Sequence, residues 1–255
     1  MATLSESSAT EQRLDLKEMT NARVSLGRHG AGLPTRAQLS FLLDHARARE
    51  AVWTSVDRTS LADRINRLGL SVVGINSMAA DRSIYVRRPD LGRLLSVESA
   101  QLLKQAAAGK IYEVAIVVAD GLSSSAVDLN AAPLIEALLP KIAALNLLMA
   151  PVALANQARV ALGDPVGEAI GAKLTIVLVG ERPGLSAADS LGAYITYGPK
   201  SGNPDSCRNC ISNIREGGLP VREAAEIISA LVRDMMRTGV SGVALKAAVA
   251  KFPEN

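Results

Sequence analysis

Two uncharged runs of mostly β-branched residues constrain the fold of this chain more than any other feature. They are "VAIVV" at residues 114–118 and "LTIVLV" at residues 174–179. A strand with one face in water alternates polar and apolar side chains, whereas a strand covered on both faces is apolar throughout. The two runs therefore predict central strands of a mostly parallel sheet with helices on both sides, which is an α/β doubly wound, Rossmann-like fold.

Helical patterns alternate with strand patterns from about residue 96 onward. The segment "SVESAQLLKQAAA" begins with Ser96, a residue type that caps helix starts. The segment "VREAAEIISALVRDMMR", residues 221–237, has an apolar face and is followed by Gly239, which is typical of a helix end. We therefore predict that residues 96–255 form the α/β domain.

Residues 1–95 predict a different unit, an arm followed by a helical and short-strand subdomain. Leucines recur at spacings of three and four between residues 37 and 53, which predicts an amphipathic helix. The segments "LSVVGIN" (residues 70–76) and "SIYVRRPDLGRLL" (residues 83–95) predict two short strands with a turn at Pro89.

The charge of this amino-terminal part favours contacts with a protein partner. Residues 1–95 hold 14 Lys and Arg against 10 Asp and Glu, and 13 of these 14 cations are Arg. The guanidinium fork suits planar contacts with carboxylates better than a general cationic coat. An arginine-rich solvated surface is the alternative interpretation. Nucleic acid fits poorly, because acids interrupt the cations and only 3% of the residues are aromatic.

Composition also argues against membrane insertion and against a metal centre. The apolar stretch "IAALNLLMAPVALA" is shorter than the roughly 18 to 20 residues of a membrane span. Cys207 and Cys210 are the two cysteines, and the chain has two histidines, which makes a zinc site or a disulfide framework a weak interpretation. The polar amino terminus lacks the pattern of a secretory signal, so we expect a cytosolic protein with two ordinary thiols.

Two loops follow the predicted central strands, where ligands bind in open α/β sheets. In "ADGLSSSA", Asp120 ends the strand, Gly121 allows a tight turn, and Ser123 offers a hydroxyl at the start of a helix. This loop suits either an anion site or simple helix capping. In "GERPGLS", Glu181 and Arg182 should point to opposite sides of an extended chain. A phosphate site would not place a glutamate at its entrance, and no nucleophile or general-base motif is present, so we predict no catalytic residue.

Several blocks in order resemble the small (light) subunit of ethanolamine ammonia-lyase. They are "TRAQLSFLLDHARAR", "YVRRPDLGR", "ADGLSSSAV", "LVGERPGLSAADSLGAYITYGP" and "CISNIREGG", and the similarity spans roughly residues 24 to 245. The resemblance implies an adenosylcobalamin-dependent enzyme that converts ethanolamine to acetaldehyde and ammonia. It also implies a TIM-barrel large subunit as partner, a hexamer of such heterodimers, and a location in the cytoplasm or a bacterial microcompartment lumen.

The resemblance also implies which residues contact the cofactor. Glu181, Val160 and Cys210 match the contact positions of the family, and Glu181 would accept N–H groups from the amides around the corrin ring. We extend this surface to Arg182, Asp120, Gly121 and Ser123 as neighbours. The alternative functions are a stand-alone nucleotide- or phosphate-binding α/β enzyme that uses the loop at residues 120–125, and a scaffolding protein of a shell or complex.

Overall fold

The computed structural model describes residues 16–20 and 22–251, and these residues form one six-stranded sheet. The strands are β1 (Val72–Asn76), β2 (Val114–Ala119), β3 (Val152–Asn156), β4 (Leu174–Gly180), β5 (Leu191–Tyr197) and β6 (Arg208–Ile214). Their order is β1-β3-β2-β4-β5-β6; the first four are parallel, whereas β5 and β6 each run antiparallel to the preceding strand in that order. The two β-branched runs form β2 and β4, which lie side by side in the middle of the sheet and are buried throughout.

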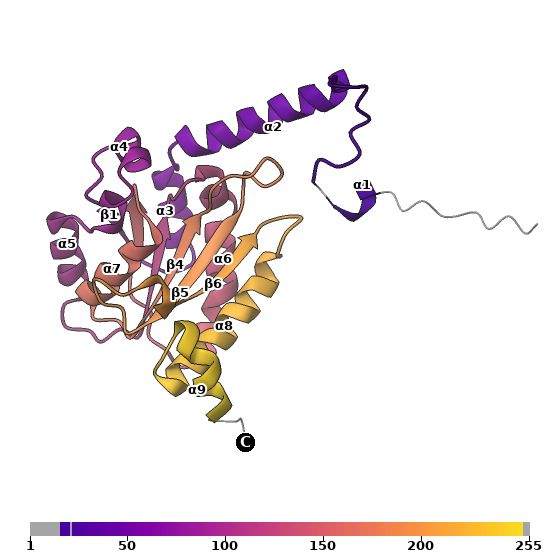
Figure 1. Cartoon of the computed structure of the whole chain (residues 1–255). Helices are drawn as coiled ribbons and strands as arrows, with labels where there is room; N and C mark the ends of the chain where they lie inside the picture. Colours follow the sequence, from indigo (N-terminus) through magenta and orange to yellow (C-terminus); the bar gives the residue numbers. More distant parts are fainter. Residues whose placement is uncertain (1–15, 21, 252–255) are drawn as a thin grey trace, which may run out of the picture.

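Helices cover both faces of this sheet, which confirms the predicted α/β class (Figure 1). One face packs against α3 (Arg58–Asn66), α6 (Ser124–Ala144) and α8 (Val221–Thr238). The other packs against α5 (Val97–Ala107) and α7 (Gly163–Ile170). The remaining helices are α1 (Leu16–Met19), α2 (Thr35–Trp53), α4 (Arg82–Arg87) and α9 (Leu245–Lys251), and short 3-10 turns are η1 (Leu91–Arg93), η2 (Val160–Leu162), η3 (Asp205–Cys207) and η4 (Gly242–Ala244).

The predicted helix ends have the expected local chemistry. Ser96 precedes α5, and its hydroxyl accepts a hydrogen bond from the backbone N–H of Ser99. Gly239 follows α8 in the left-handed conformation, with φ of 73°, which glycine adopts without strain. These two helices were therefore specified by residues close to them in the sequence.

The second predicted short strand was wrong. Residues 82–87 form helix α4 and residues 91–93 form η1, whereas the first predicted strand is β1. Helix α4 begins where the Asp81 carboxylate accepts a hydrogen bond from the backbone N–H of Ile84, at 2.8 Å. Tyr85 is fully buried and its ring contacts two arginine side chains, so tertiary packing favours a helix over the strand propensity of "IYV".

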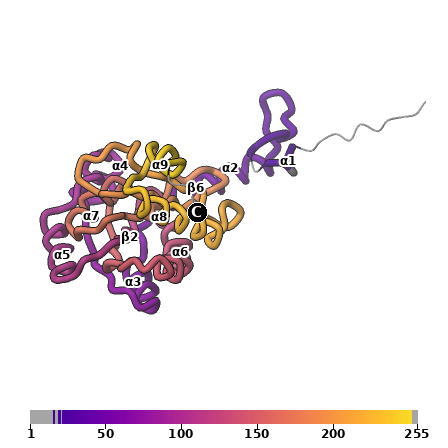
Figure 2. Tube along the Cα trace, turned by 90° about the horizontal axis from the view of Figure 1, so that it is seen from below, coloured from indigo at the N-terminus to yellow at the C-terminus, as the bar shows by residue number. Residues whose placement is uncertain are grey.

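Helix α2 confirms the predicted helix, but its leucines do not enter a core. Leu39, Leu42 and Leu43 are 61%, 53% and 51% exposed. The carboxyl end of the helix is anchored, because Ala51 is buried and Arg82 donates to the carbonyl of Val52 at 2.6 Å. Figures 1 and 2 show α2 extending from the sheet toward α1, which lies away from the body of the molecule.

Strand β1 joins the amino-terminal part to the rest of the sheet. It lies before the predicted boundary at residue 95 and pairs with β3 from Val72 with Val152 to Asn76 with Asn156. The division into residues 1–95 and 96–255 by partner and cofactor contacts stays a prediction. Within residues 16–20 and 22–251, no helix is both long and apolar enough to span a membrane.

Candidate functional site

The two antiparallel strands leave part of one sheet face accessible. Helices α5 and α7 contact β1, β2 and β4 on this face. Tyr194 of β5 is paired with Val177 of β4 on one side and with Cys210 of β6 on the other, so the three side chains lie on the same face. Val177 is buried beneath the α5–α7 layer, Tyr194 is half-buried, and Cys210 is exposed. The accessible surface therefore begins where the helical cover ends.

A cavity of about 640 Å³ lies over this part of the sheet, and we call it the sheet-face cavity. It brings together residues from β5, β6, η1, η2 and η3 that are far apart in the sequence. Its lining residues are Pro89, Asp90, Arg93, Arg159, Val160, Ala161, Tyr194, Asp205, Arg208 and Cys210. Two of the predicted contact residues, Val160 and Cys210, thus line the same concave surface.

The thiol and the phenol of this cavity both remain protonated at neutral pH. Partial desolvation raises the pKa of the Cys210 thiol above its usual range; the hydrogen bond with Tyr194 opposes this effect, and the charge of Glu181 adds to it. Burial is also the main reason why the pKa of Tyr194 is raised, followed by its hydrogen bond with Cys210. Cys210 can therefore contribute packing and a weak hydrogen bond, and it is a poor nucleophile. Cys207 is a second free thiol, in η3, and does not line this cavity.

Glu181 lies at the tip of β4, next to the sheet-face cavity but outside its lining. Its Oε2 atom accepts hydrogen bonds from the Ser190 hydroxyl at 2.5 Å and from the backbone N–H of Asn213 at 3.2 Å. Its Oε1 atom lies over Gly192, where an added Cβ would be 2.9 Å from Oε1 and 3.0 Å from Cε2 of Tyr194. Glu181 and Tyr194 are thus neighbours across a glycine that leaves both side chains room.

The geometry of Glu181 leaves one carboxylate oxygen for a ligand. Both hydrogen bonds go to Oε2, and no described residue donates to Oε1. A carboxylate that is oriented by two donors and retains one acceptor suits an N–H group of a neutral amide. Arg182, the next residue, is exposed.

The other predicted residues lie at the same strand ends but do not line the sheet-face cavity. Asp120 is buried, and its carboxylate accepts from the backbone N–H groups of Gln157 at 3.0 Å and Ala158 at 2.8 Å. It also pairs with Arg82 at 3.3 Å. Desolvation by burial raises the pKa of Asp120, and these donors oppose that effect. Asp120 therefore connects the ends of β2 and β3 within the protein.

Gly121 and Ser123 have comparable internal roles. Gly121 has φ of 55°, and an added Cβ would lie 2.1 Å from the carbonyl oxygen of Gly180. The Ser123 hydroxyl accepts from the backbone N–H of Ala126 at 3.1 Å, which caps α6, and it donates to the carbonyl of Ala188 at 2.6 Å. Helix capping thus accounts for Ser123, and the assignment of this loop to a ligand stays a prediction.

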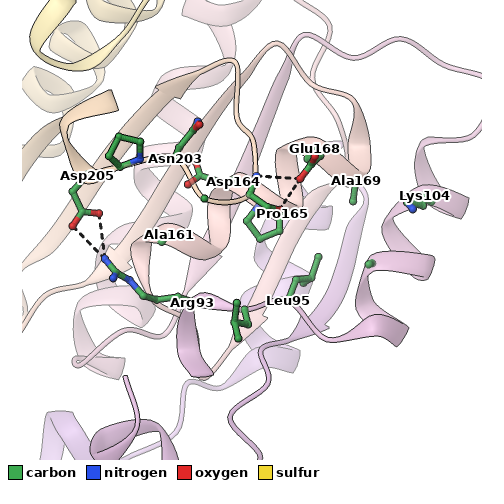
Figure 3. Close-up of a pocket in the computed structure, with 15 residues that line it drawn as sticks. Arg93, Leu95, Lys104, Ala161, Asp164, Pro165, Glu168, Ala169, Asn203 and Asp205 are labelled. Atoms are coloured by element: carbon green, nitrogen blue, oxygen red, sulfur yellow. Dashed lines mark hydrogen bonds and ion pairs between the residues drawn. The ribbon is translucent and has the colours of Figure 1, made fainter. Parts of the chain in front are cut away.

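A second cavity of about 740 Å³ adjoins the first and shares Arg93, Ala161 and Asp205 with it (Figure 3). Arg93 and Asp205 form an ion pair at 3.2 Å across their common wall. On another wall, Glu168 accepts a hydrogen bond from the Ser201 hydroxyl at 2.6 Å. This second cavity is lined by charges of both signs, from Arg93, Lys104, Asp164, Glu168 and Asp205.

Sequence reasoning missed Tyr194, Arg159 and Arg208 as cavity residues. Tyr194 follows from the register of β5 with β6, and those antiparallel strands were not among the predicted ones. Arg159 directly precedes Val160, so its proximity to a predicted contact was the available signal. Arg208 depends on tertiary structure, since it forms a buried ion pair with Asp164 of α7.

Comparison with known proteins gives one consistent result. The family model described as "Ethanolamine ammonia-lyase light chain (EutC)" matches residues 10–246. A protein from Bradyrhizobium diazoefficiens named ethanolamine ammonia-lyase small subunit is 50% identical over 234 residues, which cover 91% of this chain and 89% of that protein. Small subunits from Azotobacter vinelandii and Pseudomonas aeruginosa are 47% and 45% identical, over 91% and 95% of this chain and 86% and 90% of those proteins.

Proposed function

The chain belongs to the ethanolamine ammonia-lyase light-chain family, and we propose that it holds adenosylcobalamin against a catalytic large subunit. As a small subunit it is part of a lyase complex. The observation that carries the proposal is the sheet-face cavity, which Val160 and Cys210 both line beside the oriented carboxylate of Glu181.

The residues around this cavity fit the chemistry of cobalamin. The rim of a corrin ring carries neutral amide side chains, which need acceptors for their N–H groups, and Oε1 of Glu181 supplies one acceptor. Val160 and the protonated thiol of Cys210 are uncharged groups of this cavity and offer packing surface to the ligand. The volume of the cavity, about 640 Å³, suits a ligand edge that is partly enclosed by a second protein.

In this proposal the chain binds and orients the cofactor and makes no bonds itself. When bound, adenosylcobalamin supplies the radical chemistry of ethanolamine deamination. Ser190 and the backbone of Asn213 fix the Glu181 carboxylate, so that a corrin amide would meet a preorganised acceptor. The raised pKa values of Cys210 and Tyr194 keep both groups neutral next to the ligand.

We further propose that the partner is a TIM-barrel large subunit and that six such heterodimers assemble. The exposed leucines of α2 support a protein partner. Several neighbouring leucines on one exposed helix face form an apolar patch, and such patches mark interaction sites. The complex would act in the cytoplasm or in the lumen of a bacterial microcompartment.

Co-expression with a large subunit tests this function. The purified complex, loaded with adenosylcobalamin, should release ammonia from ethanolamine and show the absorption bands of cobalamin after gel filtration. The isolated chain should release no ammonia. Ammonia release by the isolated chain, or a complex that never retains cobalamin, would contradict the proposal.

A further inference from the structure

Arg159 is the one arginine of the sheet-face cavity that lacks a carboxylate partner among the described residues. Arg93 pairs with Asp205 at 3.2 Å, and Arg208 pairs with both Asp164 and Asp205. For Arg159, the contacts are the ring of Tyr85, at 4.3 Å, and the carbonyl oxygen of Tyr85, at 3.5 Å. The remaining acid of the cavity, Asp90, is already paired with Arg88. The positive charge of Arg159 is therefore not neutralised within the described part of the chain.

The surroundings of Arg159 hold its side chain in place. The Tyr85 ring contacts the guanidinium groups of both Arg159 and Arg82, and its hydroxyl donates to the carbonyl of Ala158 at 3.1 Å. The backbone N–H of Arg159 donates to the carbonyl of Gly92 at 2.8 Å. An added Cβ on Gly92 would lie 2.9 Å from Cγ of Arg159 and 2.8 Å from Cε2 of Tyr85. Close packing thus orders the arginine before any ligand arrives, which lowers the entropic cost of binding.

Desolvation strengthens the preference of Arg159 for an anion. The residue is half-buried, and its Nε atom is buried without a hydrogen-bond partner among the described residues. A cation that has lost water and gained no carboxylate interacts strongly with a nearby negative charge. The planar fork of the guanidinium matches two oxygens of a phosphate group.

We infer that Arg159 binds the phosphodiester in the nucleotide tail of cobalamin. This inference rests on the proposed function, since it assigns one charged group of that ligand to one residue of the same cavity. Glu181 would meet neutral amides with an acceptor, whereas Arg159 would meet the anionic linkage with paired donors. Arg159 is a binding residue in this assignment and takes no part in the reaction.

The test compares three ligands on the complex with the large subunit. Cobinamide has the corrin ring and its amides without the nucleotide, cobinamide phosphate adds a phosphate, and cobalamin has the full tail. Arg159→Met should weaken cobalamin and cobinamide phosphate by roughly 10- to 100-fold and should change cobinamide by less than about threefold. Dissociation constants from absorption titrations measure these effects.

Arg93→Met is the matched control, because it removes a cation of the same cavity that is already paired with Asp205. It should weaken all three ligands by similar factors. Arg159→Lys keeps the charge and should recover part of the loss for the two phosphate-containing ligands. Equal weakening of all three ligands by Arg159→Met would overturn the inference, as would the same ligand preference in the Arg93→Met complex.

A second measurement applies if cobinamide binds too weakly for titration. The dissociation constant of cobalamin should rise with KCl concentration in the wild-type complex, and Arg159→Met should flatten that dependence. An unchanged salt dependence would overturn the inference. A different result would be that the wild-type complex binds inorganic phosphate through Arg159, whereas Arg159→Met leaves the affinity for cobalamin unchanged. That result would overturn the inference and assign Arg159 to a free anion. If the wild-type complex binds none of cobinamide, cobinamide phosphate and cobalamin, the proposed function itself is refuted. The results that overturn only the role of Arg159 all require a wild-type complex that binds cobalamin.

Discussion

At the scale of single residues, Glu181 illustrates how a surface carboxylate becomes a directed acceptor. The Ser190 hydroxyl and the Asn213 N–H occupy Oε2, which leaves Oε1 toward Gly192 and Tyr194. A charge-assisted hydrogen bond to a fixed carboxylate is stronger than one between neutral groups. Gly192 leaves space for this oxygen, because a Cβ at that position would lie 2.9 Å from Oε1.

Replacement of Glu181 by alanine should weaken cobalamin binding by about 1.5 to 3 kcal/mol, because a charge-assisted bond is lost. Glu181→Gln keeps an acceptor oxygen without the charge and should have a smaller effect. Titration of the complex with cobalamin measures both. Glu216→Ala removes an exposed carboxylate with the same change in net charge and should leave the affinity unchanged. If Glu181→Ala binds cobalamin as tightly as the wild type, then Glu181 does not contact the cofactor.

The Cys210 thiol should react slowly with iodoacetamide. Its pKa is raised, so at any given pH a smaller fraction is thiolate than in a free cysteine, whose pKa is about 8.5. In the Cys207→Ser complex, peptide mapping by mass spectrometry should show a rate that rises with pH, with a midpoint above that of free cysteine. Bound cobalamin should slow the reaction further. A rate that does not depend on cobalamin would place Cys210 away from the ligand.

At the scale of elements, the ends of the parallel strands are connected by close backbone contacts. The carbonyl of Gly180, at the end of β4, accepts a hydrogen bond from the backbone N–H of Leu122 at 2.8 Å. Gly121 approaches the same carbonyl so closely that a Cβ would lie 2.1 Å from it. Two glycines thus let the loop after β2 pack directly on the loop that carries Glu181.

Substitution of Gly121 by alanine should destabilise the protein far more than the same change at Gly171. Both glycines have positive φ, of 55° and 75°, which costs alanine about 1 kcal/mol. Gly171 has open space around it, whereas Gly121 faces backbone atoms that cannot move aside. We expect a loss of about 1 kcal/mol for Gly171→Ala and of more than about 3 kcal/mol for Gly121→Ala. Urea unfolding measures the difference, and equal midpoints would contradict this account.

At the scale of the whole molecule, the sheet-face cavity and the exposed leucines lie on different parts of the chain. The sheet-face cavity is built by the antiparallel edge of the sheet and the η turns. The exposed leucines lie on α2, which is anchored at its carboxyl end and extends from the body of the molecule (Figure 1). In the proposed complex, α2 would give the large subunit a second contact surface besides the one around the sheet-face cavity.

Charge on the exposed face of α2 should prevent assembly without unfolding the chain. Leu42→Asp places a carboxylate among the neighbouring leucines, where a partner would have to desolvate it. Co-purification with a tagged large subunit should be lost, and the circular dichroism spectrum of the variant should match the wild type. Leu129→Asp on α6 is the matched control, since Leu129 is 59% exposed and should tolerate the change with the complex intact. Normal assembly of the Leu42→Asp variant would exclude this face from the interface.

The sequence by itself determined the central layers of the fold. The unbroken apolar runs of β2 and β4 require cover on both faces, and the capping residues of α5 and α8 lie next to the helices that they end. These signals are local or depend on composition, so they can be recognised without coordinates. The positions of Val160, Glu181 and Cys210 came from resemblance to a family, because no spacing in one chain relates residues so far apart.

Only the tertiary structure decided how the site is assembled. The register of β5 with β6 places Tyr194 beside Cys210, and Gly192 brings Glu181 next to Tyr194. Tyr85 packs against Arg82 and Arg159, and the segment around it forms helix α4 where a strand was predicted. The same packing orders Arg159, which has no carboxylate partner among the described residues. Such contacts join residues that are distant along the chain, and their energies depend on desolvation and close packing, which exist only once the chain has folded.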